Sequence, residues 1–197
     1  MYKRQVTLCP AHVNVPAYIA LAEEGRLAEA VKMIRKDNPF PTACALVCEH
    51  PCEERCRRTM VDAPVNIRGI KKYIVDTVAA DTVETPAPLA PTGKRVAVVG
   101  SGPAGLACAQ QLARAGHKVT VYEKNEKAGG LLRYGIPDFK LPKDLIDRRI
   151  EQMQAEGVAF KFGTAVGVKS FSQGVFSQAQ KLSLIHISEP TRLALIS

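Results

Sequence analysis

The chain has 197 residues, of which 46% are hydrophobic, and it carries a formal net charge of +8. This length and composition allow one sizeable domain or two small ones, and no apolar run approaches membrane-spanning length. The N-terminus lacks the charged-then-apolar pattern of a secretory signal, which predicts a cytoplasmic protein. The basic residues are scattered, and several flank cysteines or a glycine-rich loop, a distribution that argues against nucleic-acid binding.

Both ends of the chain resemble a translated sequencing adapter. The sequence LSLIHISEPTR at residues 182–192 matches the translation of a transposase-type adapter. The reverse complement of the codons for its first five residues encodes MYKRQ, the sequence of residues 1–5. One inverted repeat would therefore account for both termini. We set residues 1–5 and 182–197 aside as adapter-derived and expect the genuine sequence to be a fragment from Val6 to about Lys181.

The first part of the chain, residues 6–80, predicts a helical domain. Apolar residues recur at helical spacing from Pro16 to Lys36, and Asn38-Pro39 ends the pattern, so one helix is expected there. A second helical stretch runs over about 66–80. Between the two, cysteines stand at a strict four-residue spacing: Cys44, Cys48, Cys52 and Cys56.

Residues 81–93 (DTVETPAPLAPTG) carry three prolines among small and polar residues. We expect a stiff, extended linker here, and hence a domain boundary. Beyond it, residues 94–181 predict the incomplete beginning of a Rossmann-like α/β domain with a parallel sheet. Its expected elements are strands at 95–99 and 118–123, an intervening helix that ends at residue 115, a helix at 144–156, and a strand in which Val158, Phe160 and Phe162 alternate.

A glycine-rich loop joins the first predicted strand to its helix and reads Gly100-Ser101-Gly102-Pro103-Ala104-Gly105. Gly100 permits a tight turn, Gly102 lets backbone approach a pyrophosphate, and Gly105 lets helix and strand pack closely. The N-terminus of the helix would face the phosphates. Glu123, 18 positions after Gly105, ends the next strand and could accept hydrogen bonds from ribose hydroxyls. This context favours a dinucleotide site over a purely structural turn.

Paired glycines, Gly129-Gly130, follow just beyond Glu123. Such a pair can simply mark a turn. At this position it could also bring backbone amides to a dinucleotide. The pair favours FAD over NAD, because many flavoproteins carry such a segment there.

The cysteine spacing C-x3-C-x3-C-x3-C differs from the paired C-x2-C of common structural zinc sites. Cys9-Pro10 resembles the end of a ferredoxin run, in which the last cysteine ligates the other of two clusters. The pattern therefore favours two interleaved [4Fe–4S] clusters, one of which has lost ligands with missing N-terminal sequence. Zinc and free thiols are the alternatives. Cys108, alone on the predicted dinucleotide-domain helix, is expected to be a buried small hydrophobe.

Four segments resemble, in this order, the glutamate synthase small-subunit family: CPAHVNVPAYIALAEEGR, NPFPTACALVCEHPCEERCRR, VAVVGSGPAGLACA and GGLLRYGIPDFKLPK. That family includes the related electron-input region of dihydropyrimidine dehydrogenase and stand-alone iron–sulfur flavoprotein oxidoreductases. The resemblance covers Val6 to about Val168. It implies a helical domain with two [4Fe–4S] clusters, then an FAD domain interrupted by an NADPH domain, and this chain stops before the NADPH domain.

The resemblance also implies an FAD site. It places the loop from Gly100 to Gly105 at the pyrophosphate and Glu123 at the adenosine ribose. Three further residues would contact FAD through their main chain. A fourth stands where relatives often place an arginine that reaches FAD. The main-chain residues are Gly130, Leu131 and Val166, and the fourth is Lys140.

For the clusters, the resemblance shows one departure. In relatives, a Gln or Glu on the helix after the cysteines can complete one cluster, and the matching position here is Lys71. A protonated amine has no lone pair to donate, so we expect Cys44 to ligate instead. The surviving cluster would then be held by Cys9, Cys44, Cys48 and Cys52. Cys56 would belong to the cluster whose other ligands are lost.

The sequence thus predicts the electron-input part of an oxidoreductase. The parent protein would take a hydride from NAD(P)H onto FAD and release electrons singly to the clusters and to an acceptor such as a glutamate synthase large subunit. The fragment alone is expected to be inactive, and no side-chain acid or base is assigned. Two alternatives remain: a non-catalytic electron-relay or scaffold subunit, and a zinc-binding interaction module fused to an NAD-binding fold.

Overall fold

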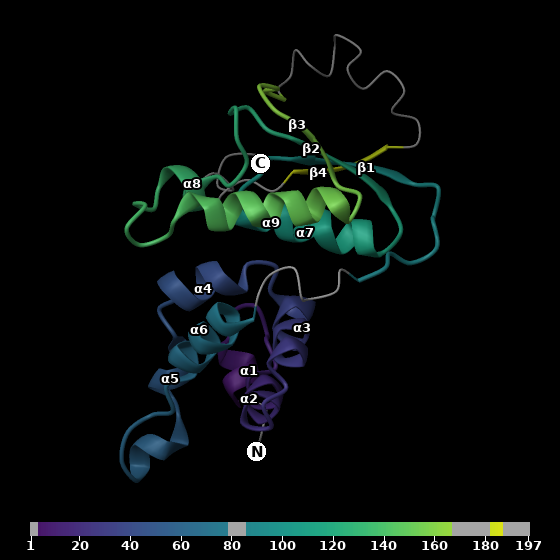
Figure 1. Ribbon diagram of the computed structural model, residues 1–197. Coiled ribbons are helices and arrows are strands. Elements are labelled where there is room, and N and C mark those ends of the chain that lie inside the picture. The colour runs from purple at the N-terminus through teal and green to yellow at the C-terminus, as the bar shows by residue number, and fades with distance from the viewer. Residues whose placement is uncertain (1–3, 79–85, 167–181, 187–197) are drawn as a thin grey trace, which may run out of the picture. The chain divides into compact units, whose positions relative to one another are not determined.

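The computed structural model describes residues 4–78, 86–166 and 182–186. The chain divides into two compact units, Met1–Glu84 and Thr85–Ser197. In Figure 1 the first unit consists of helices, and the second combines a sheet with helices. The division falls inside the segment predicted to be a linker, and each unit has its own buried apolar residues.

The N-terminal unit is helical, in agreement with the prediction. Tyr18, Ile34 and Ile74 come from three different helices and have no exposed surface, so they form the centre of its core. The last helix begins after Asn66, whose side chain accepts a hydrogen bond from the Gly69 amide at 2.8 Å. The elements are α1 (Arg4–Leu8), α2 (Val15–Glu23), α3 (Leu27–Asp37), α4 (Pro41–Val47), α5 (Pro51–Glu54), the 3₁₀ helix η1 (Arg57–Met60) and α6 (Ile67–Thr77).

The single helix predicted for residues 16–36 is wrong, because the chain breaks into α2 and α3 at Gly25. Gly25 has a φ of +75°, in the left-handed region. Its amide donates to the carbonyl of Ala22 at 3.1 Å, and the amide of Arg26 donates to the carbonyl of Leu21 at 2.9 Å. This pair of bonds is the Schellman motif, which ends a helix. The turn lets α2 and α3 pack against each other.

The second unit contains a parallel sheet with the strand order β3-β2-β1-β4. β1 and β2 pair in register, with Val96 opposite Val119. Figure 1 shows α7 and α9 on the same face of this sheet. The predicted beginning of a Rossmann-like domain is therefore confirmed. The elements are β1 (Arg95–Val99), α7 (Pro103–Arg114), β2 (Lys118–Tyr122), α8 (Leu131–Tyr134), α9 (Lys143–Ala155), β3 (Ala159–Lys161) and β4 (Leu182–His186).

The centre of the sheet is apolar because β1 lies between two neighbouring strands and beneath a helix. Ala97 and Val98 have no exposed surface, and Leu106 of α7 is equally buried. Such continuous apolar strands are typical of parallel sheets. β3 is shorter than the predicted alternation, and the rings of Phe160 and Phe162 stack with their centroids 5.7 Å apart.

The strand β4 pairs in parallel with β1, with Leu182 opposite Arg95. It lies in the segment predicted to be adapter-derived. Apolar, β-compatible sequence can add to an open sheet edge through main-chain hydrogen bonds, whatever its origin. The pairing therefore does not test the adapter prediction. Residues 1–3 and 187–197 of the predicted adapter segments lie outside the described residues.

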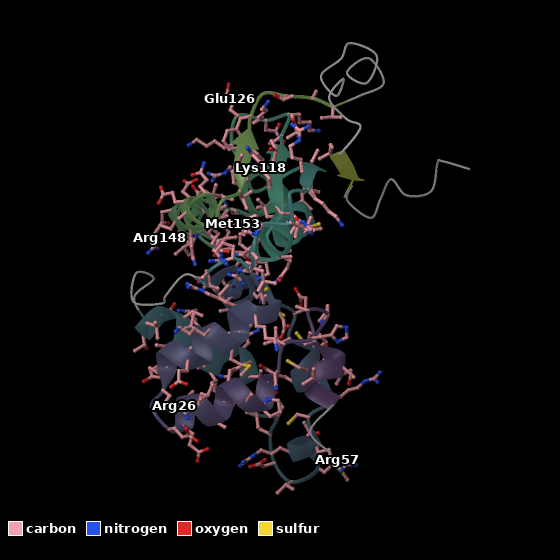
Figure 2. The ribbon with its side chains drawn as sticks, turned by 90° about the vertical axis from the view of Figure 1, so that its right-hand side faces the viewer. Arg26, Arg57, Lys118, Glu126, Arg148 and Met153 are labelled. Carbon is pink, nitrogen blue, oxygen red and sulfur yellow. The ribbon has the colours of Figure 1, made fainter. Side chains whose placement is uncertain are left out.

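Basic side chains project from both units. Figure 2 labels Arg26 and Arg57 in the first unit and Lys118 and Arg148 in the second. Some of this charge is neutralised locally, since Arg26 forms an ion pair with Glu29. Within the described ranges, no helix is long and apolar enough to cross a membrane.

Candidate cofactor sites

The glycine-rich loop between β1 and α7 is held tightly at its base. Gly100 has a φ of +94°, and its amide donates to the carbonyl of Tyr122 at 2.8 Å. A Cβ on Gly105 would lie only 2.1 Å from the carbonyl oxygen of Gly100. Any side chain at Gly105 would therefore push α7 away from the strand that precedes it.

The other end of this loop is open. Gly102 caps the N-terminus of α7, and a Cβ built on it would meet no atom within 4 Å. Its φ of −69° is accessible to any residue. Pro103 and Ala104, the first residues of the helix, are exposed beside it. The open space thus lies at the N-terminus of a twelve-residue helix, where backbone amides favour a phosphate group.

The paired glycines Gly129 and Gly130 pack against the glycine-rich loop. The amide of Gly129 donates to the carbonyl of Ser101 at 3.0 Å. Gly130 has a φ of +51°, and a Cβ on it would lie 2.7 Å from the Cα of Gly102. The two segments meet so closely that bare backbone borders the open space at Gly102. This open space, which a Cβ on Gly102 would enter, fits the pyrophosphate of a dinucleotide.

Glu123 lies buried beside the loop and binds it directly. Its Oε2 accepts hydrogen bonds from the amide and the hydroxyl of Ser101, at 2.8 and 2.5 Å. Its Oε1 accepts from the amide and the side-chain nitrogen of Asn125, both at 2.9 Å. Burial raises the pKa of Glu123, but these hydrogen bonds outweigh burial, and the resulting pKa lies below its ordinary value. A ribose hydroxyl would have to share the carboxylate with these donors or replace one of them.

The remaining residues predicted for the FAD site have fewer contacts with the glycine-rich loop. Leu131 begins α8, next to Gly130, and is 54% exposed. Lys140 is exposed in a turn in which its amide donates to the carbonyl of Pro137 at 3.0 Å. Val166 is half-buried. In the described part of the chain, no hydrogen bond joins Lys140 or Val166 to the glycine-rich loop.

A different lysine organises the segment around Lys140. Lys143 Nζ donates to the carbonyls of Leu132 at 3.2 Å, of Leu141 at 3.0 Å and of Ile136. Lys143 is not among the residues predicted from the sequence, because a lysine that binds nearby backbone carbonyls looks the same in sequence as one that reaches a ligand. Its place just after Leu141-Pro142, at the start of a helix, was the available signal.

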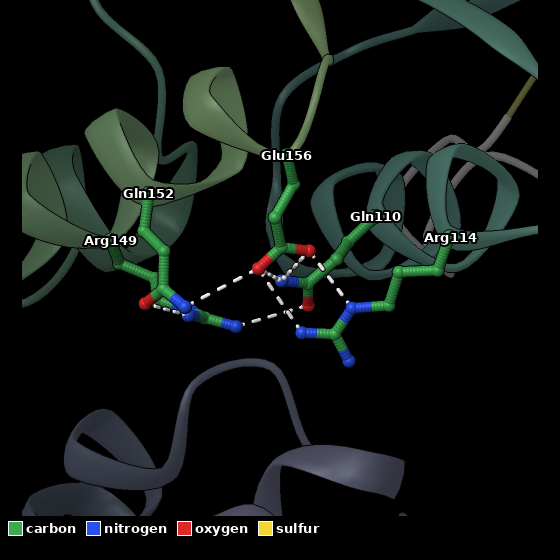
Figure 3. Close-up of polar contacts among 5 residues, drawn as sticks. All are labelled: Gln110, Arg114, Arg149, Gln152 and Glu156. Carbon is green, nitrogen blue, oxygen red and sulfur yellow. Dashed lines mark hydrogen bonds and ion pairs between the residues drawn. The ribbon is translucent and has the colours of Figure 1, made fainter. Parts of the chain in front are cut away.

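A buried polar network joins α7 to the end of α9 (Figure 3). The carboxylate of Glu156 accepts hydrogen bonds from Gln110 at 2.9 Å and from Arg114 at 2.8 Å. Arg149 donates to the side-chain oxygen of Gln110 at 3.1 Å, and Gln152 donates to Glu156 at 3.3 Å. Because α7 carries the glycine-rich loop at its N-terminus, this network fixes the helix that positions the loop.

The cysteines predicted as ligands lie along loops and short helices of the N-terminal unit. They are distributed over five positions: Cys9 after α1, Cys44 within α4, Cys48 at the end of α4, Cys52 within α5 and Cys56 just before η1. Cys52 and Cys56 are buried and the other three are half-buried. Cys108, on α7 in the other unit, is only half-buried, so its predicted burial is wrong.

The charges of Cys9 and Cys48 act on both Cys44 and Cys52. Burial raises the pKa of Cys44. A hydrogen bond with Asn38 and the charge of Lys71 oppose this shift, and the charges of Cys48 and Cys9 add to it. Burial also raises the pKa of Cys52, again with Cys9 and Cys48 adding to the shift and Lys71 opposing it. The structure therefore brings these four cysteines and Lys71 into one neighbourhood.

Cys56 lies close to Arg58. Its charge raises the pKa of Arg58, after the larger effect of Asp62. The assignment of Cys56 to a different cluster stays a prediction.

Backbone contacts hold Cys48 in place between α4 and α5. The Arg68 guanidinium of α6 donates to the carbonyl of Cys48 at 3.0 Å. The Arg68 amide donates to a carboxylate oxygen of Glu53 at 2.7 Å. The amide of His50 points at the sulfur of Cys48, at 3.3 Å. Helix α6 thus positions the cysteine-bearing segment through the amide and the guanidinium of Arg68.

Tyr18 supplies an orphaned polar atom in the same neighbourhood. Its side chain is fully buried, and its hydroxyl has no hydrogen-bond partner among the described residues. Burial raises the pKa of Tyr18, and the charges of Cys52 and Cys9 raise it further. Four grouped thiols beside an unsatisfied donor fit a [4Fe–4S] cluster, because such clusters take cysteine thiolates and accept hydrogen bonds at their sulfurs.

A single metal ion needs its ligand side chains closer together than a cluster does. In residues 4–78 and 86–166, no three His, Cys, Asp or Glu side chains lie close enough together to hold one metal ion. Thiolates around one zinc ion lie about 3.8 Å apart, because each Zn–S bond is about 2.3 Å long. In a [4Fe–4S] cluster each thiolate binds a different iron, so the ligands stand further apart.

Comparisons with protein families assign a type to each unit. Residues 2–83 match the family described as dihydropyrimidine dehydrogenase domain II, 4Fe-4S cluster. Residues 98–143 match the NAD(P)-binding Rossmann-like domain. The first match contains all five cysteines predicted as ligands, and the second contains both glycine-rich segments.

Curated relatives match most of the chain. The small chain of NADPH glutamate synthase from Mycobacterium tuberculosis is 45% identical over 81% of this chain, and that from Bacillus subtilis is 44% identical over 81%. The chain is a homologue of glutamate synthase small chains. The beta subunit of NADP(+)-dependent formate dehydrogenase from Moorella thermoacetica is 41% identical over 81% of the chain. The homologue described here spans 33% of the length of either small chain and 26% of the beta subunit.

These matches confirm the family resemblance and the order of the domains, iron–sulfur first and Rossmann-like second. They also confirm iron–sulfur and dinucleotide cofactors, and FAD fits both the fold and the family. Among solved structures, a 2-naphthoyl-CoA reductase complex is 28% identical over 46% of this chain and 14% of its own, with a TM-score of 0.38.

Proposed function

We propose that this chain is the electron-input part of an NAD(P)H-dependent iron–sulfur flavoprotein oxidoreductase. One observation carries the proposal: a single chain combines a group of thiols, in which Cys9 and Cys48 act on both Cys44 and Cys52, with open space lined by backbone at a helix N-terminus. When bound, FAD accepts a hydride and the clusters pass electrons one at a time. The homologues include glutamate synthase small chains and the beta subunit of an NADPH–Fe(3+) oxidoreductase from Geobacter sulfurreducens, which supports a shared electron-input role.

The second unit would hold FAD mainly through its backbone. The amides at the start of α7 would face the pyrophosphate, and Gly102 and Gly130 would leave room for it. Glu123 would orient the loop through Ser101 and accept hydrogen bonds from the ribose. Lys140, exposed in its turn, would contribute a positive charge to the cofactor.

The first unit would hold one complete cluster. Cys9, Cys44, Cys48 and Cys52 are the thiols of this group, and they supply the four ligands that a [4Fe–4S] cluster needs. Cys56 would bind the second cluster. Electrons would leave toward an acceptor subunit in the cytoplasm, such as a glutamate synthase large subunit.

Anaerobic reconstitution with iron and sulfide tests the cluster assignment. We expect about four irons per chain, loss of the iron from Cys52→Ser, and its retention in Cys56→Ser, which is the matched control. Loss of iron from Cys56→Ser with retention in Cys44→Ser would show that Cys56 closes the surviving cluster. Zinc without sulfide in the wild-type protein would contradict the iron–sulfur function itself.

A further inference from the structure

Tyr18 is an unusual residue for a helical core. It lies on α2 with no exposed surface, in the same apolar cluster as Cys52, and Cys9 packs against that cluster. Its hydroxyl finds no partner among the described residues. An unsatisfied buried hydroxyl destabilises a fold, so a fold that keeps one gains from it elsewhere. The hydroxyl is therefore a hydrogen-bond donor held ready beside two proposed cluster ligands.

Lys71 brings a positive charge to the same place. It is only 7% exposed on α6, and its Nζ lies 6.0 Å from the centre of the Tyr18 ring. In the described part of the chain no carboxylate forms an ion pair with it, whereas its neighbour Lys72 pairs with Asp76. The groups on which Lys71 acts are the thiols of Cys44 and Cys52. Glu53 also acts on Tyr18 and Cys52, but its carboxylate accepts a hydrogen bond from the Arg68 amide and forms no ion pair with Lys71 in the described part of the chain. A bound anion would therefore supply the counter-charge of this buried lysine.

We propose that Tyr18 and Lys71 tune the cluster held by Cys9, Cys44, Cys48 and Cys52, with the hydroxyl donating a hydrogen bond to a cluster sulfur and the ammonium group acting as a fixed positive charge. This inference rests on the proposed function, since it takes the four cysteines as ligands. In this proposal Lys71 binds no iron. It acts on the cluster only through its positive charge.

The direction of the effect follows from electrostatics. Reduction adds one negative charge to the cluster, and both a hydrogen bond to sulfur and a nearby cation stabilise that charge. The two side chains therefore raise the reduction potential of this cluster, which makes it a better acceptor for electrons that arrive from the flavin. Their burial strengthens the effect, because little water is present to screen the charge.

Substitutions that keep the size of each side chain test the proposal. Tyr18→Phe removes only the hydroxyl, and Lys71→Met removes the charge from a chain of similar length. The reconstituted 197-residue protein is titrated potentiometrically, and the reduced cluster is followed by electron paramagnetic resonance. At the wild-type midpoint we expect each variant to show about a tenfold lower ratio of reduced to oxidised cluster, which corresponds to about 59 mV for a one-electron couple. Lys71→Arg, which restores the charge, should recover most of the shift.

Two exposed residues on α6, the helix that carries Lys71, provide matched controls. Tyr73 is 59% exposed and Lys72 is paired with Asp76 at the surface, so Tyr73→Phe and Lys72→Met should leave the midpoint unchanged. A full iron content with an unchanged midpoint in Tyr18→Phe and Lys71→Met would overturn the proposal. Loss of iron from both variants would also overturn it, by showing a role in assembly. A wild-type protein that binds no iron and sulfide would instead contradict the proposed function.

Discussion

The amide and the hydroxyl of Ser101 both donate to the same carboxylate oxygen of Glu123, at 2.8 and 2.5 Å. One buried charge thus holds the second residue of the glycine-rich loop at two points. The loop therefore owes its shape to an acid at the end of the neighbouring strand as well as to its glycines.

Replacement of Glu123 should loosen this loop. We expect Glu123→Gln to lower the free energy of unfolding by about 2 kcal/mol at neutral pH, because hydrogen bonds to a charged group are lost. Urea denaturation measures the change. Glu126→Gln, at an exposed position nearby that Figure 2 labels, removes the same charge and should leave stability within about 0.5 kcal/mol of wild type.

The effect of Glu123 should depend on pH. The pKa of this carboxyl is lowered in the folded protein, so its stabilisation is fully present above the unfolded value of about 4.3 and is lost as the pH falls through the folded value. The gap in unfolding free energy between wild type and Glu123→Gln should therefore be constant from pH 7 to about 5 and shrink below about pH 4. A gap that widens on acidification would contradict the lowered pKa.

Two glycines of one loop should respond differently to substitution. A Cβ at Gly102 meets no atom within 4 Å, so Gly102→Val should keep stability within about 1 kcal/mol of wild type but abolish FAD retention. A Cβ at Gly105 would lie 2.1 Å from a carbonyl oxygen, so Gly105→Ala should lower stability by about 1–3 kcal/mol even without cofactor. Urea denaturation and flavin absorbance after desalting separate the two results. Stoichiometric FAD in Gly102→Val would count against the FAD assignment.

The network around Glu156 should be essential to packing between α7 and α9. Glu156→Ala leaves the guanidinium of Arg114 without its carboxylate, and we expect a loss of about 3 kcal/mol in unfolding free energy. Glu151→Ala, at an exposed position on α9, is the matched control and should cost less than about 0.5 kcal/mol. Equal losses in the two variants would show that the network adds nothing to stability.

The adapter prediction is tested on DNA. The codons for residues 1–5 should be the reverse complement of the codons for residues 182–186. Sequencing of the source DNA reads this directly. A codon choice that breaks the complementarity would remove the basis for setting these ends aside.

The sequence was a good guide where one local pattern decides the structure. After Arg95 the run to Val99 is apolar, and the central residues of β1 are buried, which agrees with the predicted buried strand. The helical spacing around Gly25 was misleading, since apolar residues continue on both sides of a break made by one backbone angle. A glycine flanked by helical spacing on both sides is the signal that marks such a break.

Contacts between distant residues were beyond a reading of local patterns. Gln110 and Glu156 are 46 positions apart, and only the packing of α7 against α9 makes them partners. Tyr18 looks in sequence like any aromatic residue of a helix face. The missing partner of its hydroxyl becomes visible only when the atoms around it are known.

Because three carbonyls bind Lys143, the reactivity of its amine would report local opening of this segment. Its side chain is 19% exposed, whereas Lys140 in the preceding turn is exposed. An acylating reagent should therefore modify Lys140 quickly and Lys143 slowly, because an ammonium group that donates to three oxygens must first be released and deprotonated. The ratio of the two rates, read by peptide mass spectrometry, would measure how often the segment between them opens, without any substitution in the protein.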